Sequence, residues 1–365
     1  MRLLQYFLLP FSLLYGLVML VRNLFYNARI LPSVSFPLPV ISLGNLSMGG
    51  TGKTPVVEYL IRLLKDPFHV ATLSRGYGRE TRGYLLASRR TNSRYIGDEP
   101  LQYVKKFRDI RVAVDEKRAR GIRKLLEKAP DTDVVLLDDA FQHRHVIPGL
   151  SILVMDYNNP YFEDHVFPSG RLREFSCGAK RADLILVTKT PKIFSPITRR
   201  RMLEDLRPAS HQKVFFSYIK YGAPLPVFEP QPCPFPAKLS YLLLFTGIAS
   251  DYPLREHLER CCSDLTVIRY PDHHPYSEKD ALYLKKCFDD LPSRKKAMVT
   301  TEKDMMRLKN PEIGNILRSL PLYYIPIEFD FHGSEKDAFD KAIVSYVEKN
   351  KRDRRVPGNE NNHPA

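Results

Sequence analysis

The stretch SLGNLSMGGTGKTPVVEYL, from Ser42 to Leu60, decides the fold. It is close to the pattern G-x-x-x-x-G-K-[ST], a loop whose backbone N–H groups surround the phosphates of a nucleotide. Gly52, Lys53 and Thr54 match the end of this pattern, but Ser47 stands where the first glycine is expected. The next glycines are at positions 49 and 50, so the turn that the first glycine usually makes can be relocated to them.

The surroundings of this loop fit a nucleotide site. PVISLGN predicts a strand before it, and KTPVVEYLIRLLK predicts a helix after it, with Pro55 in the first turn, where a missing N–H is tolerated. The phosphates would then lie at the positive end of the helix. Lys53 is expected to reach the β- and γ-phosphates, and the Thr54 hydroxyl is expected to hold Mg²⁺. The expected nucleotide contacts are Ser47, Met48, Gly49, Gly50, Thr51, Gly52, Lys53 and Thr54.

A second motif offers carboxylates for the metal. In DVVLLDDAFQHR an apolar run is followed directly by Asp138 and Asp139. Two adjacent carboxylates after a buried strand are unfavourable unless a cation or several donors compensate them. Mg²⁺ is the cation that a phosphate loop uses. The alternative is structural, with Asp139 capping the N-terminus of a helix.

The remaining pattern predicts the fold class. Short apolar runs alternate with helical patterns, which indicates an α/β protein with a mostly parallel sheet of the P-loop NTPase type. We expect this P-loop domain over residues 31–220, and a Pro-rich connection over 221–238, since prolines exclude a central strand. A second, smaller α/β domain is expected over 239–350, including the stretch PLYYIPIEF, and a disordered tail over 351–365. The strands expected in the first domain are residues 38–43, 70–73, 112–114, 134–137, 151–155 and 184–187.

The N-terminal residues 1–30 predict a membrane-anchoring helix. Leu3 to Val21 carries no charged residue and is close to the length that crosses a bilayer. A signal peptide and a buried helix are the alternatives, but the run is long for a signal peptide and no A-x-A-like cleavage site follows it. Arg22 and Arg29 suit the headgroup interface, and the basic body of the chain is expected in the cytoplasm.

Charge and cysteine content narrow the partners. The net charge of +15 points to nucleic acid, anionic lipid or phosphorylated small molecules. No aromatic and basic module typical of nucleic-acid binding occurs, so no nucleic-acid partner is expected. Five cysteines without C-x-x-C spacing indicate a reducing compartment and no structural metal. LILVTKTP resembles a base-binding strand and loop but lacks the Asn and Asp of N-K-x-D, which favours ATP over GTP.

Three further polar stretches follow predicted strands or turns. They are SRGYGRE at 74–80, GDEP at 97–100 and RYPDHHPYS at 269–277. Ligand sites of α/β proteins gather at the carboxyl ends of strands. Each stretch taken alone is also typical of an ordinary surface turn.

Together the motifs resemble the tetraacyldisaccharide 4′-kinase family of lipid A biosynthesis. The matching stretches, in the family's order, are GNLSMGGTGKTP, SRGYGR, GDEP, LDDAFQHR, PSGRLRE, VTK, FTGIASDYPL, PDHHPYS and TEKDMMRL. Ser47 is the residue that this family usually has in its phosphate loop. The resemblance implies that ATP, with Mg²⁺, phosphorylates the 4′-hydroxyl of an acylated disaccharide 1-phosphate lipid to form lipid IVA. It also implies a site at the cytoplasmic face of the bacterial inner membrane, in contact with membrane lipids.

The resemblance assigns roles to single residues. Asp98 is expected to act as the base, assisted by His273 from the second domain, with His274 as the alternative to His273. Lys53 and Asp139 are expected at the transferring phosphoryl group, and Asp138, Asp139 and Thr54 at Mg²⁺. The expected substrate contacts are Arg75, Gln142, His143 and Arg171. No protein partner is evident, and the alternative function is a membrane-tethered P-loop ATPase acting as a switch.

Overall fold

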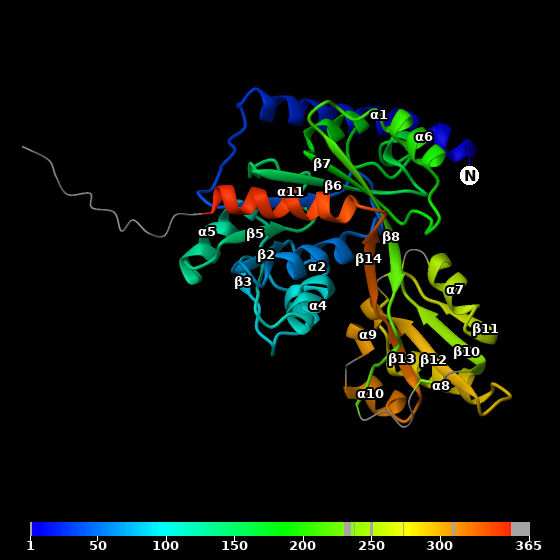
Figure 1. Cartoon of the computed structure of the whole chain (residues 1–365). Helices are drawn as coiled ribbons and strands as arrows, with labels where there is room; N and C mark the ends of the chain where they lie inside the picture. The colour runs from blue at the N-terminus through cyan, green and yellow to red at the C-terminus, as the bar shows by residue number, and fades with distance from the viewer. Residues whose placement is uncertain are drawn as a thin grey trace, which may run out of the picture.

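The chain folds into two α/β domains, each built on its own sheet (Figure 1). The computed structural model describes residues 2–229, 235–236, 238–248, 251–272, 274–308 and 311–351. In the view of Figure 1, helix α1 lies along the top of the larger domain, and the smaller domain lies below the larger one at the right.

The larger sheet places the phosphate loop at its centre. Its nine strands among the described residues have the order β14-β8-β7-β6-β1-β5-β2-β4-β3. All neighbours pair in parallel except β3 with β4 and β14 with β8. Because β1 lies between β5 and β6, the loops after these three strands meet at one edge of the sheet. The strands are β1 (Val40–Gly44), β2 (Val70–Ser74), β3 (Leu85–Leu86), β4 (Arg111–Val114), β5 (Val134–Leu137), β6 (Leu150–Asp156), β7 (Leu184–Thr188), β8 (Lys213–Tyr221) and β14 (Ile327–Phe331).

The six strands predicted for this domain are confirmed as β1, β2, β4, β5, β6 and β7, with ends that differ by at most two residues. The prediction succeeds because these strands are covered on both faces and are therefore apolar throughout. In β5, for example, all of residues 134–137 are buried. The fold class is confirmed as a P-loop NTPase-like, mostly parallel sheet with a second, smaller α/β domain.

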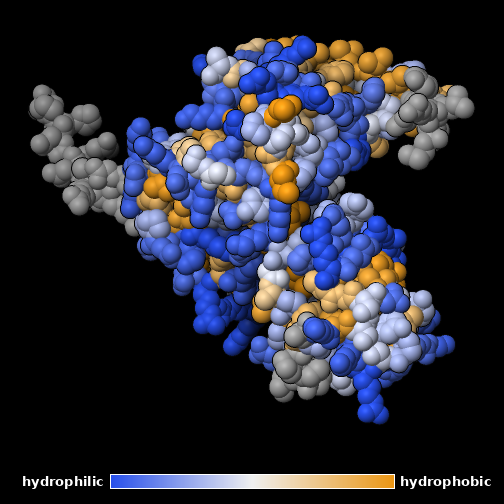
Figure 2. All heavy atoms as spheres, turned by 45° about the vertical axis from the view of Figure 1, so that its right-hand side comes forward, coloured by the Kyte–Doolittle hydropathy of each residue, from blue (hydrophilic) through white to orange (hydrophobic). Residues whose placement is uncertain are grey.

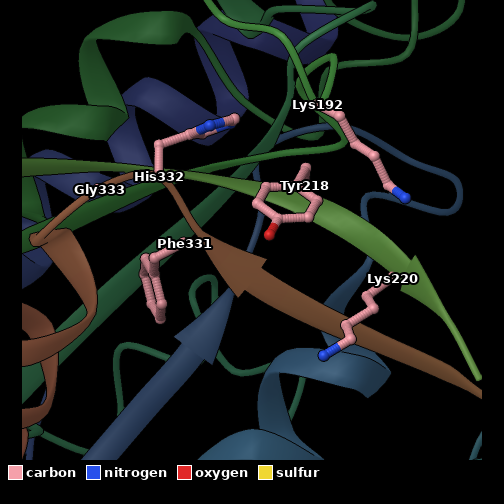
Figure 3. Close-up of a pocket in the computed structure, with 6 residues that line it drawn as sticks. All are labelled: Lys192, Tyr218, Lys220, Phe331, His332 and Gly333. Carbon is pink, nitrogen blue, oxygen red and sulfur yellow. The ribbon is translucent and has the colours of Figure 1, made fainter.

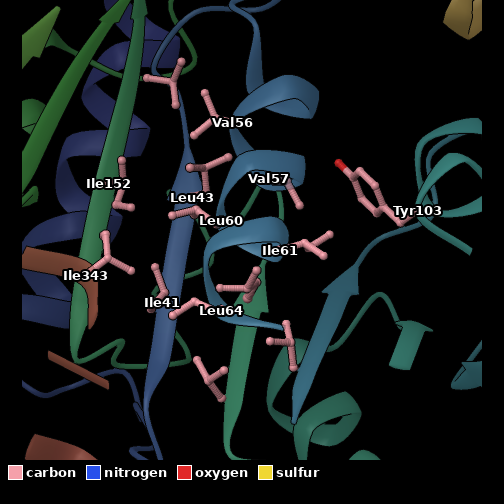
Figure 4. Close-up of a cluster of buried hydrophobic side chains, with 14 of the residues drawn as sticks. Ile41, Leu43, Val56, Val57, Leu60, Ile61, Leu64, Tyr103, Ile152 and Ile343 are labelled. Carbon is pink, nitrogen blue, oxygen red and sulfur yellow. The ribbon is translucent and has the colours of Figure 1, made fainter. Parts of the chain in front are cut away.

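Helix α2 (Lys53–Leu64) fixes the phosphate loop to the sheet. Its residues Val56, Leu60 and Leu64 recur at helical spacing and are fully buried in the same cluster as Ile41 and Leu43 of β1 (Figure 4). Burying each such side chain contributes roughly 1.5–3 kcal/mol to the fold. The other helices of this domain are α1 (Arg2–Asn27), α3 (Ser93–Ile96), α4 (Asp98–Lys106), α5 (Arg118–Lys128), η1 (Tyr161–Glu163), η2 (Ser176–Arg181), α6 (Pro196–Leu206) and α11 (Glu335–Asn350).

The smaller domain holds a five-stranded sheet among its described residues, with the order β11-β10-β12-β13-β9. Its first strand, β9, lies inside the expected Pro-rich connection and pairs with β13. Residues 230–234 and 237 of that connection lie outside the described residues, as do residues 352–365 of the expected tail. The strands are β9 (Leu225–Pro226), β10 (Leu239–Thr246), β11 (Cys262–Arg269), β12 (Lys296–Thr301) and β13 (Leu322–Ile325), and the helices are α7 (Tyr252–Leu258), α8 (Glu278–Asp289), α9 (Glu302–Leu308) and α10 (Pro311–Leu317).

The domain boundary expected at residue 350 differs from the structure. Pro326 divides the stretch PLYYIPIEF between β13 of the smaller sheet and β14 of the larger one, since proline lacks the N–H that a continuous strand needs. β14 then pairs with β8, starting at Tyr221 and Ile327, and α11 buries its apolar face in the core of the larger domain. Residues 327–350 therefore belong to the larger domain and not to the second one.

Helix α1 presents two different faces. Ser12 Oγ accepts a hydrogen bond from Ser169 N at 2.8 Å, and Tyr15 O–H donates to Arg173 O at 3.2 Å. Its opposite face exposes large apolar side chains, and Figure 2 shows hydrophobic atoms along the top of the molecule, where α1 lies. Among the described residues, α1 is the one helix long and apolar enough to cross a membrane. It nevertheless packs on the larger domain and does not project away from it.

Candidate active site

The phosphate loop makes its turn without the usual first glycine. Ser47 forms an antiparallel bridge with Leu172, so it is extended at the position where the pattern has its first glycine. The left-handed conformations lie at Gly49, with φ of 105°, and Gly52, with φ of 85°. The relocation of the turn is thereby confirmed at Gly49. Gly52 directly precedes α2, so its conformation brings the loop to the N-terminus of that helix.

Residues at the C-terminal end of β7 form hydrogen bonds with this loop. Lys189 Nζ donates to Gly50 O at 2.5 Å and to Asp156 Oδ2 at 2.7 Å. Thr188 Oγ1 donates to Thr51 O at 2.7 Å. These bonds engage the loop's carbonyl groups on the side of β7. The sequence pointed to this VTK stretch as a base-binding loop and did not indicate its contact with the phosphate loop.

Asp139 bridges two cations at the loop. Its Oδ1 lies 3.3 Å from Lys53 Nζ and 2.9 Å from Arg173 Nη1. Burial alone would raise the pKa of Asp139, but the charges of Lys53 and Arg173 outweigh burial and lower it to about 2. Asp139 is therefore ionised at neutral pH. The described residues between β5 and β6 form turns and no helix, so Asp139 does not act as a helix cap.

Asp138 lies deeper and has a different environment. Its Oδ2 accepts a hydrogen bond from Tyr103 O–H at 3.0 Å, whereas its buried Oδ1 has no hydrogen-bond partner within the described part of the chain. Burial, followed by the charges of Glu99 and Asp139, raises the pKa of Asp138 to about 7. A buried, unpaired carboxylate oxygen near other carboxylates suits a divalent cation.

Glu99 lies close to Thr54 and Asp138, although the sequence analysis assigned no role to it. Thr54 Oγ1 donates to Glu99 Oε1 at 3.2 Å, and Glu99 is close enough to Asp138 to raise its pKa. Within the described ranges, no three His, Cys, Asp or Glu side chains form a complete metal site. Mg²⁺ usually takes only one or two carboxylates and completes its shell with phosphates and water, so the residues present fit this ion.

A cationic group lies on the other side of the two aspartates. Arg118 is buried, and its Nη2 donates to Asp138 O at 3.3 Å, while its Nη1 donates to Asp115 O at 2.6 Å. Burial and the Arg118 charge lower the pKa of His143 to about 4, so its ring is neutral at pH 7. Arg75 is exposed and acts on the pKa of the same histidine. The sequence predicted Arg75 and His143 here but gave no signal for Arg118.

Two other predicted substrate contacts, Gln142 and Arg171, form hydrogen bonds and ion pairs with other groups of the protein. Gln142 Nε2 donates to Asn45 O at 2.9 Å and to Glu174 Oε1 at 3.1 Å. Arg171 Nε lies 3.1 Å from Asp164 Oδ2, and its backbone oxygen accepts from Met48 N at 2.7 Å. The structure thus places both residues next to the phosphate loop, with Gln142 bonded to its base.

Asp98 is the first residue of α4 and lies at the contact between the domains. Its Oδ2 accepts hydrogen bonds from Nη2 and Nε of Arg307, at 2.8 and 2.9 Å. Arg307 belongs to α9 of the smaller domain. His273, the expected partner of Asp98, lies outside the described residues. His274 shares a hydrogen bond with Asp280 Oδ2 at 3.1 Å and stacks on Tyr270 within the smaller domain.

A cavity of about 290 Å³ lies beside the strands that connect the domains. Figure 3 shows Tyr218 and Lys220 on β8, Phe331 at the end of β14, and Lys192 on a separate loop near Tyr218. His332 at its wall shares a hydrogen bond of 2.7 Å with Thr190 Oγ1, one residue beyond Lys189. The cavity is therefore adjacent to the segment that supports the phosphate loop.

The central phosphate loop, the carboxylates after β5 and the polar residues across the domain contact define a P-loop nucleotide-binding protein. The model of the tetraacyldisaccharide-1-P 4′-kinase family matches residues 4–348. The chain belongs to this family, and the resemblance stated from its motifs is confirmed.

Relatives of known name and structure agree. The tetraacyldisaccharide 4′-kinase of Bacteroides thetaiotaomicron is 42% identical over 98% of this chain and 97% of its own length. That of Parabacteroides distasonis is 43% identical over 93% of this chain and 94% of its own. The crystal structure of an "apo" form of LpxK from Aquifex aeolicus, in complex with ATP, has a TM-score of 0.70 at 28% identity and covers 94% of this chain and 99% of that one. The chain is therefore an enzyme of the kinase class that uses ATP with Mg²⁺.

Proposed function

We propose that this enzyme transfers the γ-phosphoryl group of ATP to the 4′-hydroxyl of tetraacyldisaccharide 1-phosphate and so forms lipid IVA. The assignment of Asp98 as the base rests on its position next to Glu99 in the sequence. Asp98 precedes Glu99, and Glu99 contacts Thr54, the hydroxyl expected at Mg²⁺. A carboxylate one residue from the metal group is a suitable proton acceptor for a hydroxyl that attacks the γ-phosphate.

The other roles follow from charge. Thr54 and one or two of the carboxylates of Glu99, Asp138 and Asp139 would hold Mg²⁺, which neutralises charge on the β- and γ-phosphates when bound. Lys53, held by Asp139, stabilises charge on the transferring phosphoryl group. Because burial raises the pKa of Asp138 to about 7, this carboxyl group would have to give up its proton near neutral pH in order to hold the cation.

The substrates approach from two sides. The cavity beside Tyr218 is on the side of β7, which in a P-loop sheet is the side of the base, so we assign the adenosine part of ATP to it. Neutral His143 and exposed Arg75 suit the sugar hydroxyls and the anionic groups of the lipid. Arg171 and Gln142 support the loop between these two groups.

The position of α1 suits a lipid substrate. The helix packs its small polar face on the protein and exposes its apolar face, which is typical of a helix lying in the membrane interface. We propose that α1 holds the active site at the cytoplasmic face of the inner membrane, so that the acyl chains stay in the bilayer. This is a refinement of the expected single anchor.

The test is a transfer assay in detergent micelles. Wild type, Asp98→Ala and Lys53→Ala are incubated with γ-labelled ATP, Mg²⁺ and disaccharide 1-phosphate lipid. Label is expected in the lipid with wild type and at least 10²-fold less with either variant. Hydrolysis of ATP by wild type without labelling of the lipid would contradict the lipid-kinase function and favour a tethered ATPase switch.

A further inference from the structure

Two groups of ion pairs join α4 of the larger domain to α9 of the smaller one. At the start of α4, Asp98 is paired with Arg307. At its end, Lys106 Nζ lies 2.8 Å from Glu58 Oε2 of α2 and 2.6 Å from Glu302 Oε1 of α9. Helix α9 therefore holds α4 at both ends, and the proposed base is one of the two attachment points.

Arg307 is itself fixed within the smaller domain. Its side chain is only 7% exposed, and Nη1 donates to Asp304 Oδ1 at 3.1 Å. Asp304 is fully buried, and its Oδ2 accepts from Thr301 Oγ1 at 2.6 Å and from Gly247 N at 3.0 Å. One edge of the guanidinium is thus bound to a hydrogen-bonded core of its own domain, and the other edge meets Asp98.

The same core supports the loop that carries the histidine pair. A Cβ atom placed on Gly247 would lie 3.1 Å from Pro271 O and 3.3 Å from His274 Cβ. Gly247 also accepts a hydrogen bond from Arg307 Nη1 through its carbonyl oxygen, at 3.4 Å. Arg307 therefore lies between Asp98 and the base of the PDHH loop.

We propose that Arg307 is a positioning residue for Asp98, which couples docking of the smaller domain to the orientation of the proposed base. The inference rests on the proposed role of Asp98. Two N–H groups directed at one oxygen, Oδ2, fix the position of that oxygen. Asp98 is thus held in this orientation only while α9 is docked on α4.

The experiment is a double-mutant cycle in the full-length enzyme, assayed by transfer of label to disaccharide 1-phosphate lipid. Arg307→Met should lower kcat by roughly 10- to 100-fold, because the catalytic group is then misplaced. The KM for ATP should change less than about twofold. Arg307→Lys should recover part of kcat, because a single ammonium group replaces only one of the contacts. In an Asp98→Asn background, Arg307→Met should have almost no further effect.

Lys106→Met is the matched control. It also removes a charged contact between α4 and α9 but does not touch Asp98. Because the pair between Arg307 and Asp98 remains in this variant, kcat should fall much less than in Arg307→Met. A thermal melt of each variant with and without Mg²⁺-ATP shows whether it is folded, and Arg307→Lys serves for the cycle if Arg307→Met does not fold.

The outcomes separate the two assignments. If Asp98→Asn keeps wild-type kcat, the proposed base is wrong and the inference falls with it. If Asp98→Asn is inactive while Arg307→Met keeps or raises kcat, or if their effects multiply, only the role of Arg307 is overturned.

Discussion

At the scale of the residue, the two neighbouring aspartates have opposite electrostatics. The pKa of Asp138 is raised to about 7, so between pH 4 and 7 the folded protein holds a proton that the unfolded chain has released. Stability therefore falls as the pH rises through this range. Asp138→Asn should raise the free energy of unfolding at pH 8, on the order of 2 kcal/mol, and change it little at pH 4. Thermal melts without nucleotide at these two pH values measure this.

Asp139 should behave in the reverse way. Its pKa is lowered to about 2 by Lys53 and Arg173, so its contribution to stability is present above pH 4 and is lost as the pH falls toward 2. Asp139→Asn leaves two cations without their partner and should lower the melting temperature at pH 8. Both variants should also lose most of the stabilisation that Mg²⁺-ATP gives to wild type. Shifts of the same sign at pH 8 would contradict the distinction.

The sequence could predict some of these residues and not others for a physical reason. Lys53, Thr54, Asp138 and Asp139 lie in contiguous motifs whose spacing follows from a strand, a turn and a helix. The residues to which sequence reasoning gave no role reach the site from separate elements, and only the fold brings them together; they are Glu99, Arg118, Arg173, Lys189 and Arg307, of which all but Arg118 lie in the quoted motifs.

At the scale of the element, the approach of β1 to the loop after β5 depends on Gly44. A Cβ atom there would lie 2.7 Å from both Cβ and N of Phe141. Gly44→Ala should therefore displace the loop that carries Asp139 and destabilise the protein by about 1–3 kcal/mol. Gly49→Ala meets no atom within 4 Å and bears only the strain of its φ of 105°, roughly 1–2 kcal/mol. The melting temperatures of both variants are measured without nucleotide. A larger fall for Gly49→Ala than for Gly44→Ala would contradict the expected order of destabilisation.

Helix α1 offers a second test at this scale. Leu14 and Val18 are 64% and 59% exposed and lie one turn apart on the apolar face. Replacing both with Glu should lower binding to vesicles of anionic phospholipid at least 10-fold. Each apolar side chain that is no longer buried in the membrane reduces the free energy of binding by roughly 1.5–3 kcal/mol. Leu282→Glu, at an exposed position on α8 of the smaller domain, is the control and should leave binding unchanged. Equal loss in the control would contradict a membrane role for α1.

At the scale of the whole molecule, the smaller domain is an insertion in the larger one. The chain leaves the larger sheet after β8 and returns through β14, and these two strands pair with each other. Sequence patterns did not reveal this, because β13 and β14 read as one apolar strand and only Pro326 hints at the division. The last helix, α11, then buries Phe339, Ile343 and Val347 in the core of the first domain.

This topology predicts that the larger domain folds without the smaller one. Because Tyr221 and Ile327 are paired across β8 and β14, residues 222–326 can be replaced by the two-residue hairpin turn Asn-Gly. The shortened protein should melt cooperatively and gain stability from Mg²⁺-ATP, since it keeps the phosphate loop, Glu99 and both aspartates. It should transfer no label to lipid, because Arg307 and the PDHH loop are gone.

A chain ending at residue 333 provides the opposite case. It keeps the smaller domain and β14 but lacks α11, so it loses the buried side chains of Phe339, Ile343 and Val347. Loss of a buried phenylalanine side chain such as that of Phe339 costs about 3–5 kcal/mol of stability by itself. We expect it to lack a cooperative transition of the larger domain and to bind no ATP. If the truncated chain folds and the shortened one does not, the core of the larger domain depends on the smaller domain more than on α11, and the insertion view is wrong.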